Sequence, residues 1–124
     1  MTDEIRTVSS TGGEKGVKMQ RFDLIPVGSL QELAFLYGKG ALKYDDRNWE
    51  RGYEWGKSYA ALQRHANLFW AGEEYDNHKP DCLSTCTEHT EAHHMAAVAW
   101  HAFVLMEFTK THPEFDNRVK KGTS

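Results

Sequence analysis

The sequence contains little cysteine and no long hydrophobic run. Its two cysteines, Cys82 and Cys86, are too few for the disulfide framework of a small secreted protein. The first eighteen residues lack the apolar core of a signal peptide. The longest apolar stretch, residues 95–106, is interrupted by His101 and is too short to be a transmembrane helix. We therefore expect a protein of the reducing cytoplasm that has no membrane span.

An excess of positive charge is also missing, because 15 Lys and Arg face 18 Asp and Glu, for a formal net charge of −3. Surfaces that neutralise the phosphates of duplex nucleic acid usually carry more Lys and Arg than this. Duplex DNA or RNA is therefore not an expected partner. What is present, 40% hydrophobic and 27% charged residues in a chain of 124, is typical of one folded globular domain.

Apolar residues recur at helical spacing in three segments. The first helix is predicted to begin at Ser29, where Ser29-Leu30-Gln31-Glu32 has the pattern of a capping box. The second is predicted over residues 57–71, with Gly72 as its C-terminal stop. The third is predicted over residues 87–110. No window alternates as a half-buried strand does, so the expected fold class is all-α.

The predicted apolar faces of the second and third helices are wide. They consist of Tyr59, Leu62, Ala66, Phe69 and Trp70 on the second helix, and of Met95, Val98, Ala99, Ala102, Leu105 and Met106 on the third. Three helices offer little to cover such faces. We therefore expect a helical bundle of three main helices that is completed by dimerisation, in a homo-dimer or a higher homo-oligomer.

The ends of the chain have a different composition from its centre. Residues 1–17 are rich in Ser, Thr, Gly and charge and bury too little apolar area to order, which predicts a mobile N-terminal arm. The helical domain is predicted over residues 18–112 and opens with an extended, packed segment at residues 21–26. Residues 113–124 are predicted to be a C-terminal tail.

An acidic cluster, Glu73-Glu74-Tyr75-Asp76, follows the second predicted helix. Carboxylate oxygens are the ligands that Mg²⁺ and Mn²⁺ prefer when they bind phosphate-bearing substrates. By itself the cluster also fits a solvated helix end.

On the third predicted helix, Glu91, His94 and His101 share one stripe. That stripe is a solvated edge of the bundle, a set of buried histidines bonded to backbone carbonyls, or a ligand and proton-transfer row that faces the acidic cluster and His65.

Two further groups of side chains could carry chemistry. Cations and aromatic or amide groups suited to a triphosphate and a base are Lys18, Arg21, Lys39, Lys43, Tyr44, Arg47, Asn48, Trp49 and Arg64. From spacing alone, an ordinary charged surface with core aromatics explains them more simply.

A group of histidines and cysteines recurs at spacings near four: His78, Cys82, Cys86, His89 and His93. Thiolates with imidazoles are typical Zn²⁺ ligands. Because no standard finger spacing is present, a structural Zn²⁺ is the less favoured interpretation, behind reduced cysteines in a polar loop.

Five segments, taken in order, resemble the dATP/dGTP diphosphohydrolase family, which is common in bacteriophages and related to the MazG-like all-α nucleoside triphosphate pyrophosphohydrolases. They are KMQRFDLIP (18–26), GALKY (40–44), NWERG (48–52), LQRH (62–65) and GEEYD (72–76). The resemblance spans residues 16–108. It implies a metal-dependent hydrolase of the host cytoplasm that converts a (deoxy)nucleoside triphosphate, dATP or dGTP, to the monophosphate and pyrophosphate.

The resemblance also implies roles for particular residues. The implied metal ligands for Mg²⁺ or Mn²⁺ are Glu73, Asp76, Glu91 and His94, with Glu32 as a secondary candidate and Glu88 as the alternative to Glu91. The implied catalytic side chains are His65, Glu91 and His94, and the implied substrate-binding side chains are Lys18, Arg21, Lys43, Tyr44, Asn48, Trp49 and Arg64. The competing hypothesis is a non-catalytic helical module that binds nucleotides or a protein and holds a structural zinc.

Overall fold

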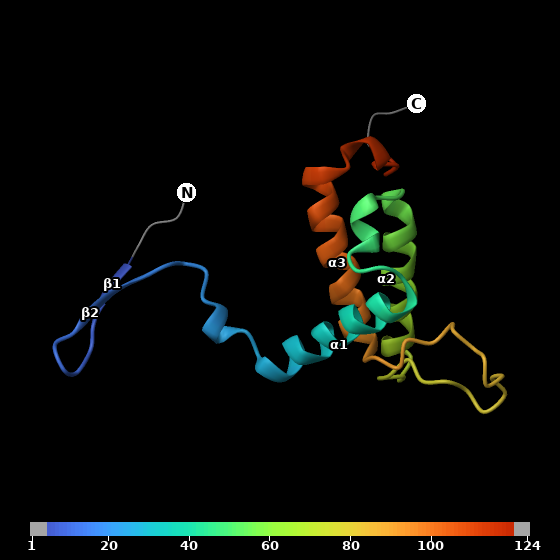
Figure 1. The fold of residues 1–124 in the computed structure, drawn as a ribbon, viewed down its shortest axis with the longest axis horizontal. Coiled ribbons are helices and arrows are strands. Elements are labelled where there is room, and N and C mark those ends of the chain that lie inside the picture. Colours follow the sequence, from blue (N-terminus) through green and yellow to red (C-terminus); the bar gives the residue numbers. More distant parts are fainter. Residues whose placement is uncertain (1–4, 121–124) are drawn as a thin grey trace. The chain divides into compact units, whose positions relative to one another are not determined.

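The computed structural model describes residues 5–120 and divides the chain into two compact units, Met1–Leu30 and Gln31–Ser124, which are described separately. The described elements are two short strands, three α-helices and three 3₁₀ turns (Figure 1). The predicted fold class, a small all-α bundle of three main helices, is confirmed. Within residues 5–120, no helix combines the length and apolar character needed to cross a bilayer.

The first unit contains an antiparallel hairpin that the sequence analysis did not predict. Strand β1 (Ile5–Val8) pairs with β2 (Glu14–Val17). In the connecting turn the Ser9 N–H donates to the Gly13 carbonyl and the Gly12 N–H to the Ser9 carbonyl, and Gly12 has a φ of 88°, which favours glycine. Strands of four residues are too short to show a clear alternation in sequence. The mobility of this region stays a prediction.

The segment predicted to be extended forms a 3₁₀ turn instead. The turn η1 (Phe22–Leu24) closes when the Leu24 N–H donates to the Arg21 carbonyl at 3.0 Å. Arg21 also donates two hydrogen bonds to the Asp23 carboxylate, at 2.8 and 2.7 Å. This bidentate pair spans two residues and holds the chain in the turn, so the prediction of an extended backbone is wrong.

Helix α1 (Val27–Lys43) begins two residues before the predicted start. The Leu30 N–H donates to the Pro26 carbonyl at 3.0 Å, so the first turn is built directly after the proline. Ser29 lies inside that turn, and the predicted capping box is wrong. Proline explains the shift, because its fixed φ suits a helix start and its missing N–H leaves no unsatisfied donor there.

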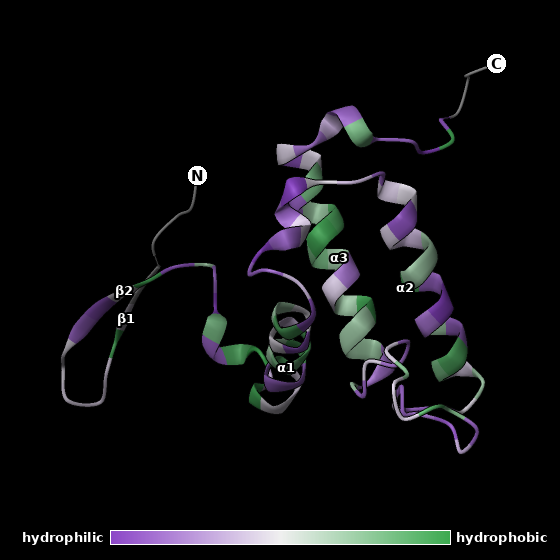
Figure 2. Ribbon diagram, turned by 45° about the vertical axis from the view of Figure 1, so that its right-hand side comes forward, coloured by the Kyte–Doolittle hydropathy of each residue, from purple (hydrophilic) through white to green (hydrophobic). Residues whose placement is uncertain are grey.

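Helices α2 (Trp55–Trp70) and α3 (His94–Thr111) lie side by side and form the body of the second unit (Figures 1 and 2). Where α2 starts and α3 ends, a hydrophobic core joins Trp55, Val104 and Phe108. Packed against it are Trp49, Tyr53, Trp100, Leu105 and Phe115. The second predicted helix is therefore confirmed to within two residues. Its predicted stop is also confirmed, because Gly72 has a φ of 108°.

The buried face of α2 differs from the predicted apolar stripe. Trp55, Ser58 and His65 are buried, whereas Tyr59 and Trp70 of the predicted stripe are exposed. Residues at spacings of three and seven share a helical face, so Ser58 and His65 accompany Trp55 toward α3. The polar side chains of α2 are thus directed inward, and part of its aromatic surface faces out.

Helix α3 begins at His94, seven residues later than predicted. The His93 side chain caps it by accepting a hydrogen bond from the Met95 N–H at 3.0 Å. Glu91 precedes the helix with a φ of 65°, so the predicted helical stripe of Glu91, His94 and His101 is wrong. Only the two histidines lie on α3, and they share its buried face with Ala97, Val104 and Phe108.

The loop of residues 71–93 joins α2 to α3 and is the yellow-to-orange segment of Figure 1. Its base is closed by backbone pairing between Tyr75 and His93. The Asp76 N–H donates to the Ala92 carbonyl, and the Asp76 carbonyl accepts from the Glu91 N–H, both at 2.9 Å. The pinched base fixes the acidic cluster against the first turn of α3.

Candidate functional site

Glu73, Asp76 and His94 converge at the base of the 71–93 loop. Glu73 follows the end of α2, Asp76 lies in the backbone pinch and His94 is the first residue of α3. One potential ligand atom from each of the three lies within 4.8 Å of the others. The structure therefore brings together three of the five predicted metal ligands.

Asp76 is the buried carboxylate of this group. Its side chain is buried, and Oδ2 accepts hydrogen bonds from the Thr90 backbone N–H at 2.9 Å and the Thr90 hydroxyl at 3.0 Å. A buried carboxylate is costly unless donors compensate it. Thr90 supplies that compensation and fixes the direction of the carboxylate.

His94 is fully buried and links Glu73 to His65. Its Nε2 lies 2.8 Å from Glu73 Oε1, and its Nδ1 lies 2.9 Å from His65 Nδ1. An ionised carboxylate only accepts, so a neutral His94 donates from Nε2 and accepts from His65 through Nδ1. Hydrogen bonds from Lys79 and then from His94 lower the pKa of Glu73, which favours its charged form.

The row of imidazoles continues to His101, which is partly buried. Its ring stacks on that of His65 with centroids 6.3 Å apart, and its Nδ1 lies 3.0 Å from the Ser58 hydroxyl. Burial, assisted by His65 and Arg64, lowers the pKa of His101 to about 4. Burial also lowers the pKa of His65, although the charge of Asp76 opposes that change. Both rings are therefore neutral near pH 7.

A cavity of about 1080 Å³ opens beside this row. Its lining includes five of the seven predicted substrate-binding residues: Lys43, Tyr44, Asn48, Trp49 and Arg64. Lys39 and Arg47 add two further cations, and Trp100 adds a second indole close to Trp49. His65 also lines the cavity, so its imidazole joins the cavity wall to the group around His94.

The remaining predicted residues lie elsewhere. Glu91 lines the cavity but pairs with Lys39 at 2.5 Å, and this contact lowers the pKa of Glu91. Glu32 accepts a hydrogen bond from Tyr75 and raises the pKa of that phenol. Lys18 and Arg21 belong to the first unit. Glu91 and Glu32 are outside the group formed by Glu73, Asp76 and His94, and all four assignments stay predictions.

Residues 9–118 match the family model described as dATP/dGTP diphosphohydrolase, N-terminal. The chain belongs to this family. The resemblance stated from the five sequence segments is thereby confirmed over nearly the whole chain. Neither the curated proteins nor the solved structures that were compared contain a match.

In this family member, the sequence analysis missed several residues that support the site. Ser58 bridges His101 and the Tyr53 hydroxyl, at 3.0 and 2.6 Å. Thr90 holds Asp76, and Lys79 pairs with Glu73 at 2.6 Å. Helical spacing from His65 could have placed Ser58 on the buried face. No sequence signal could place Thr90 or Lys79, because both act across an irregular loop.

Proposed function

We propose that this chain is a metal-dependent diphosphohydrolase that converts dATP or dGTP to the monophosphate and pyrophosphate. The observation that most strongly supports this activity is the cavity of about 1080 Å³, in which cations and aromatic rings border His65. His65 hydrogen-bonds His94, which belongs to the carboxylate group at the loop base. A binding surface for a charged, aromatic substrate thus adjoins a candidate metal site.

The side chains at the loop base fit Mg²⁺ or Mn²⁺. Glu73 and Asp76 would supply the oxygen ligands, since each carboxylate has more lone pairs than its protein hydrogen bonds use. His94 would hold Glu73 in place rather than bind the ion, because its Nε2–H donates to Glu73 and its Nδ1 accepts from His65. When bound, the ion offsets phosphate charge and lowers the pKa of a coordinated water.

The cavity residues bind and orient the substrate. Lys43 and Arg64 provide positive charge for the phosphate oxygens. Trp49 offers an indole face to the base, while Asn48 and Tyr44 offer directed hydrogen bonds. These contacts select a nucleotide over inorganic triphosphate.

His65 is the proposed proton acceptor for the attacking water. Its Nδ1–H is directed to His94 in the arrangement derived above, which leaves Nε2 with a free lone pair. Burial keeps the ring neutral and therefore able to accept. His94 and Glu73 orient the ring through their chain of hydrogen bonds. Glu91 is the second candidate acceptor, because it also lines the cavity.

The test is a panel of deoxynucleoside triphosphates with Mg²⁺ or Mn²⁺ and identification of the products. The expected result is pyrophosphate with dAMP or dGMP. Asp76→Asn should abolish turnover, while Asp81→Asn in the same loop should leave it unchanged. Failure of every substrate with either metal would refute the proposal. Nucleotide binding without turnover would instead support the non-catalytic helical module.

The proposal extends to a cytoplasmic homo-oligomer. Exposed apolar side chains remain on α2 and α3 of the second unit, namely Tyr59 and Trp70 on α2 and Phe103 and Met106 on α3. Large exposed apolar groups on a small domain favour pairing with a second copy. A shared bundle would cover them.

A further inference from the structure

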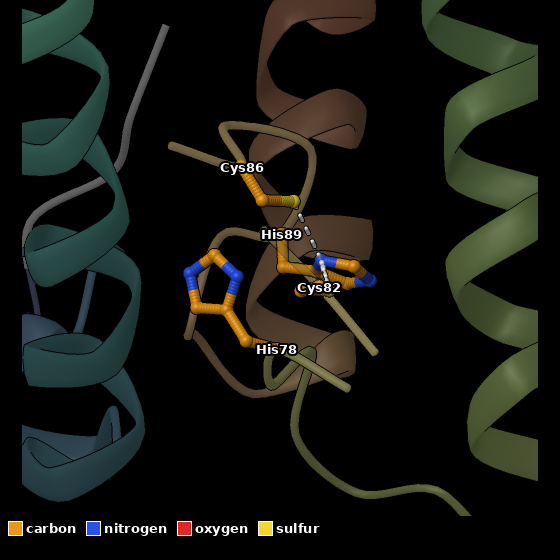
Figure 3. A group of neighbouring side chains, drawn as sticks. All are labelled: His78, Cys82, Cys86 and His89. Atoms are coloured by element: carbon orange, nitrogen blue, oxygen red, sulfur yellow. Dashed lines mark hydrogen bonds between the residues drawn. The ribbon is translucent and has the colours of Figure 1, made fainter. Parts of the chain in front are cut away.

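The proposed function leaves one cluster of metal-binding side chains unused. His78, Cys82, Cys86 and His89 come from the outer part of the 71–93 loop and converge on one point (Figure 3). One ligand atom of each lies within 4.8 Å of the other three. The group consists of two thiols and two imidazoles, and it differs in every residue from the group of Glu73, Asp76 and His94.

The distances within this cluster match those around a tetrahedral zinc ion. His89 Nδ1 lies 3.7 Å from Cys82 Sγ and 3.5 Å from Cys86 Sγ. Zn–S bonds of about 2.3 Å and Zn–N bonds of about 2.0–2.1 Å, at tetrahedral angles, separate sulfur from nitrogen by about 3.6 Å. The observed separations are therefore those that a shared ion would impose.

The backbone presents both sulfurs through tight turns. The Cys82 N–H donates to the Lys79 carbonyl and the Cys86 N–H to the Leu83 carbonyl, both at 3.0 Å. The Lys79 N–H also lies 3.2 Å from Cys82 Sγ. Backbone donors to a ligating sulfur orient it and stabilise its charge in metal sites. The cluster thus has part of an outer shell as well as four ligands.

We propose that His78, Cys82, Cys86 and His89 bind one structural Zn²⁺. Soft thiolates with imidazoles select zinc over the hard Mg²⁺ and Mn²⁺ of the proposed reaction. Four protein ligands complete a tetrahedral sphere and leave no position for water or substrate, so the ion is structural rather than catalytic. Each thiol binds as a thiolate and releases its proton to solvent.

A bound zinc ion would cross-link a loop that has no regular secondary structure of its own. Residues 77–91, which include the cluster, contain no helix or strand. A long loop with few apolar contacts opens easily unless a cross-link restrains it. The last ligand, His89, immediately precedes Thr90, which holds the Asp76 carboxylate. His78, Cys86 and His89 also line the cavity, so the ion would fix part of its wall.

The first test is metal analysis of the full chain, freed of any histidine tag, purified without chelator and then incubated with zinc and desalted. Wild-type protein should retain about one zinc per chain. Cys82→Ser and Cys86→Ser should lose it. Asp81→Asn, a carboxylate change beside Cys82, and Asp76→Asn, a change at the other candidate metal group, should keep it. Wild-type protein without zinc, or cysteine variants with a full complement, would overturn the proposal.

A second measurement uses only wild-type protein and so does not depend on the folding of variants. Replacement of zinc by Co²⁺ should give the intense visible bands of a four-coordinate ion, together with thiolate-to-cobalt charge transfer. Weak bands of a six-coordinate ion without charge transfer would contradict the assignment. Removal of the metal should also speed amide hydrogen exchange in residues 77–91 but not within α2. None of these readouts requires turnover, so they are independent of the proposed hydrolase activity.

Discussion

Histidine carries most of the polar chemistry inside this molecule. His65, His94 and His101 share one interior between α2 and α3, and each has a hydrogen-bonded polar partner. Such side chains are tolerated in a core when every polar group finds a partner. No buried side-chain nitrogen or oxygen among the described residues lacks one. The interior is therefore a satisfied network in which a proton can be held at a defined atom.

Arg64 provides the sharpest residue-scale test of the cavity. It is exposed, lines the cavity and is proposed to contact the phosphates. Arg64→Gln should lower kcat/KM for the triphosphate by about 10- to 100-fold, the equivalent of one charge-assisted hydrogen bond. Arg51→Gln, on an exposed arginine outside the cavity lining, is the matched control and should change little. Equal kinetics for both variants would remove Arg64 from the substrate site.

His112 predicts a dependence of stability on pH. Its Nδ1 lies 3.0 Å from Glu114 and its Nε2 lies 2.7 Å from the Glu50 carbonyl, so both nitrogens face acceptors. Glu114 first, and then Glu50, raise the pKa of His112 above its ordinary 6.5. This contribution is fully present below pH 6.5 and is lost as the pH rises through the folded-state pKa.

The change Glu114→Gln should move the pKa of His112 down toward 6.5, as followed by NMR titration of the imidazole. The fall in Tm with rising pH should be smaller in this variant and should end at a lower pH. Glu88→Gln, in the loop before α3, should leave the titration unchanged. An unaltered His112 titration in Glu114→Gln would show that Glu114 is not the source of the shift.

At the scale of elements, helix existence was predictable and helix boundaries were not. The stop at Gly72 was found because a left-handed residue after a helix has a distinct sequence signal. The start of α3 was placed seven residues early, since Glu91 lies at a spacing that fits a helix although its backbone is left-handed. The tertiary pinch between Asp76 and Ala92 sets that conformation, and it involves residues sixteen apart.

The turn at the end of η2 (Asn48–Arg51) offers a test at this scale. Gly52 has a φ of 89°, and a Cβ there would lie 2.8 Å from the His112 ring. Gly52→Ala should therefore lower the free energy of unfolding by about 2–4 kcal/mol, through a strained backbone and a clash. Urea unfolding curves measure the change.

Gly38→Ala is the matched control for that experiment. Gly38 lies inside α1, and a Cβ there would meet nothing within 4 Å. The substitution should raise the free energy of unfolding by about 0.5–1 kcal/mol, because alanine loses less conformational freedom in a helix. Equal effects of the two substitutions would mean that neither backbone strain nor His112 limits the choice of residue at position 52.

For the whole molecule, polar side chains inside the helix pair are accompanied by exposed apolar side chains on its outer surface. Each helix of the pair directs histidines inward and leaves aromatic or methionine side chains outside, so a single chain buries little apolar area for its size. A second copy that covers the exposed faces would add the missing apolar burial, at about 25 cal/mol per Å².

That reasoning predicts a homo-oligomer that a charge on α3 dissociates. Phe103 is half exposed on the outer side of α3. Phe103→Glu should convert the oligomer to monomers, while Lys110→Glu, a charge change in the last turn of the same helix, should not. Sedimentation velocity distinguishes these outcomes. A wild-type protein that sediments as a monomer at all concentrations would contradict the prediction.

Sequence alone determined the all-α class, the second helix and the family, because helical periodicity and ordered motifs are local properties. It also selected Glu73, Asp76 and His94 by residue type. Only the tertiary structure decided that these three meet while Glu91 pairs with Lys39. It likewise brought His78 and His89 to the two cysteines, a convergence that spacing did not favour. The conformation of an irregular loop depends on contacts between residues far apart in the sequence. Such contacts produce no periodic pattern from which they could be predicted.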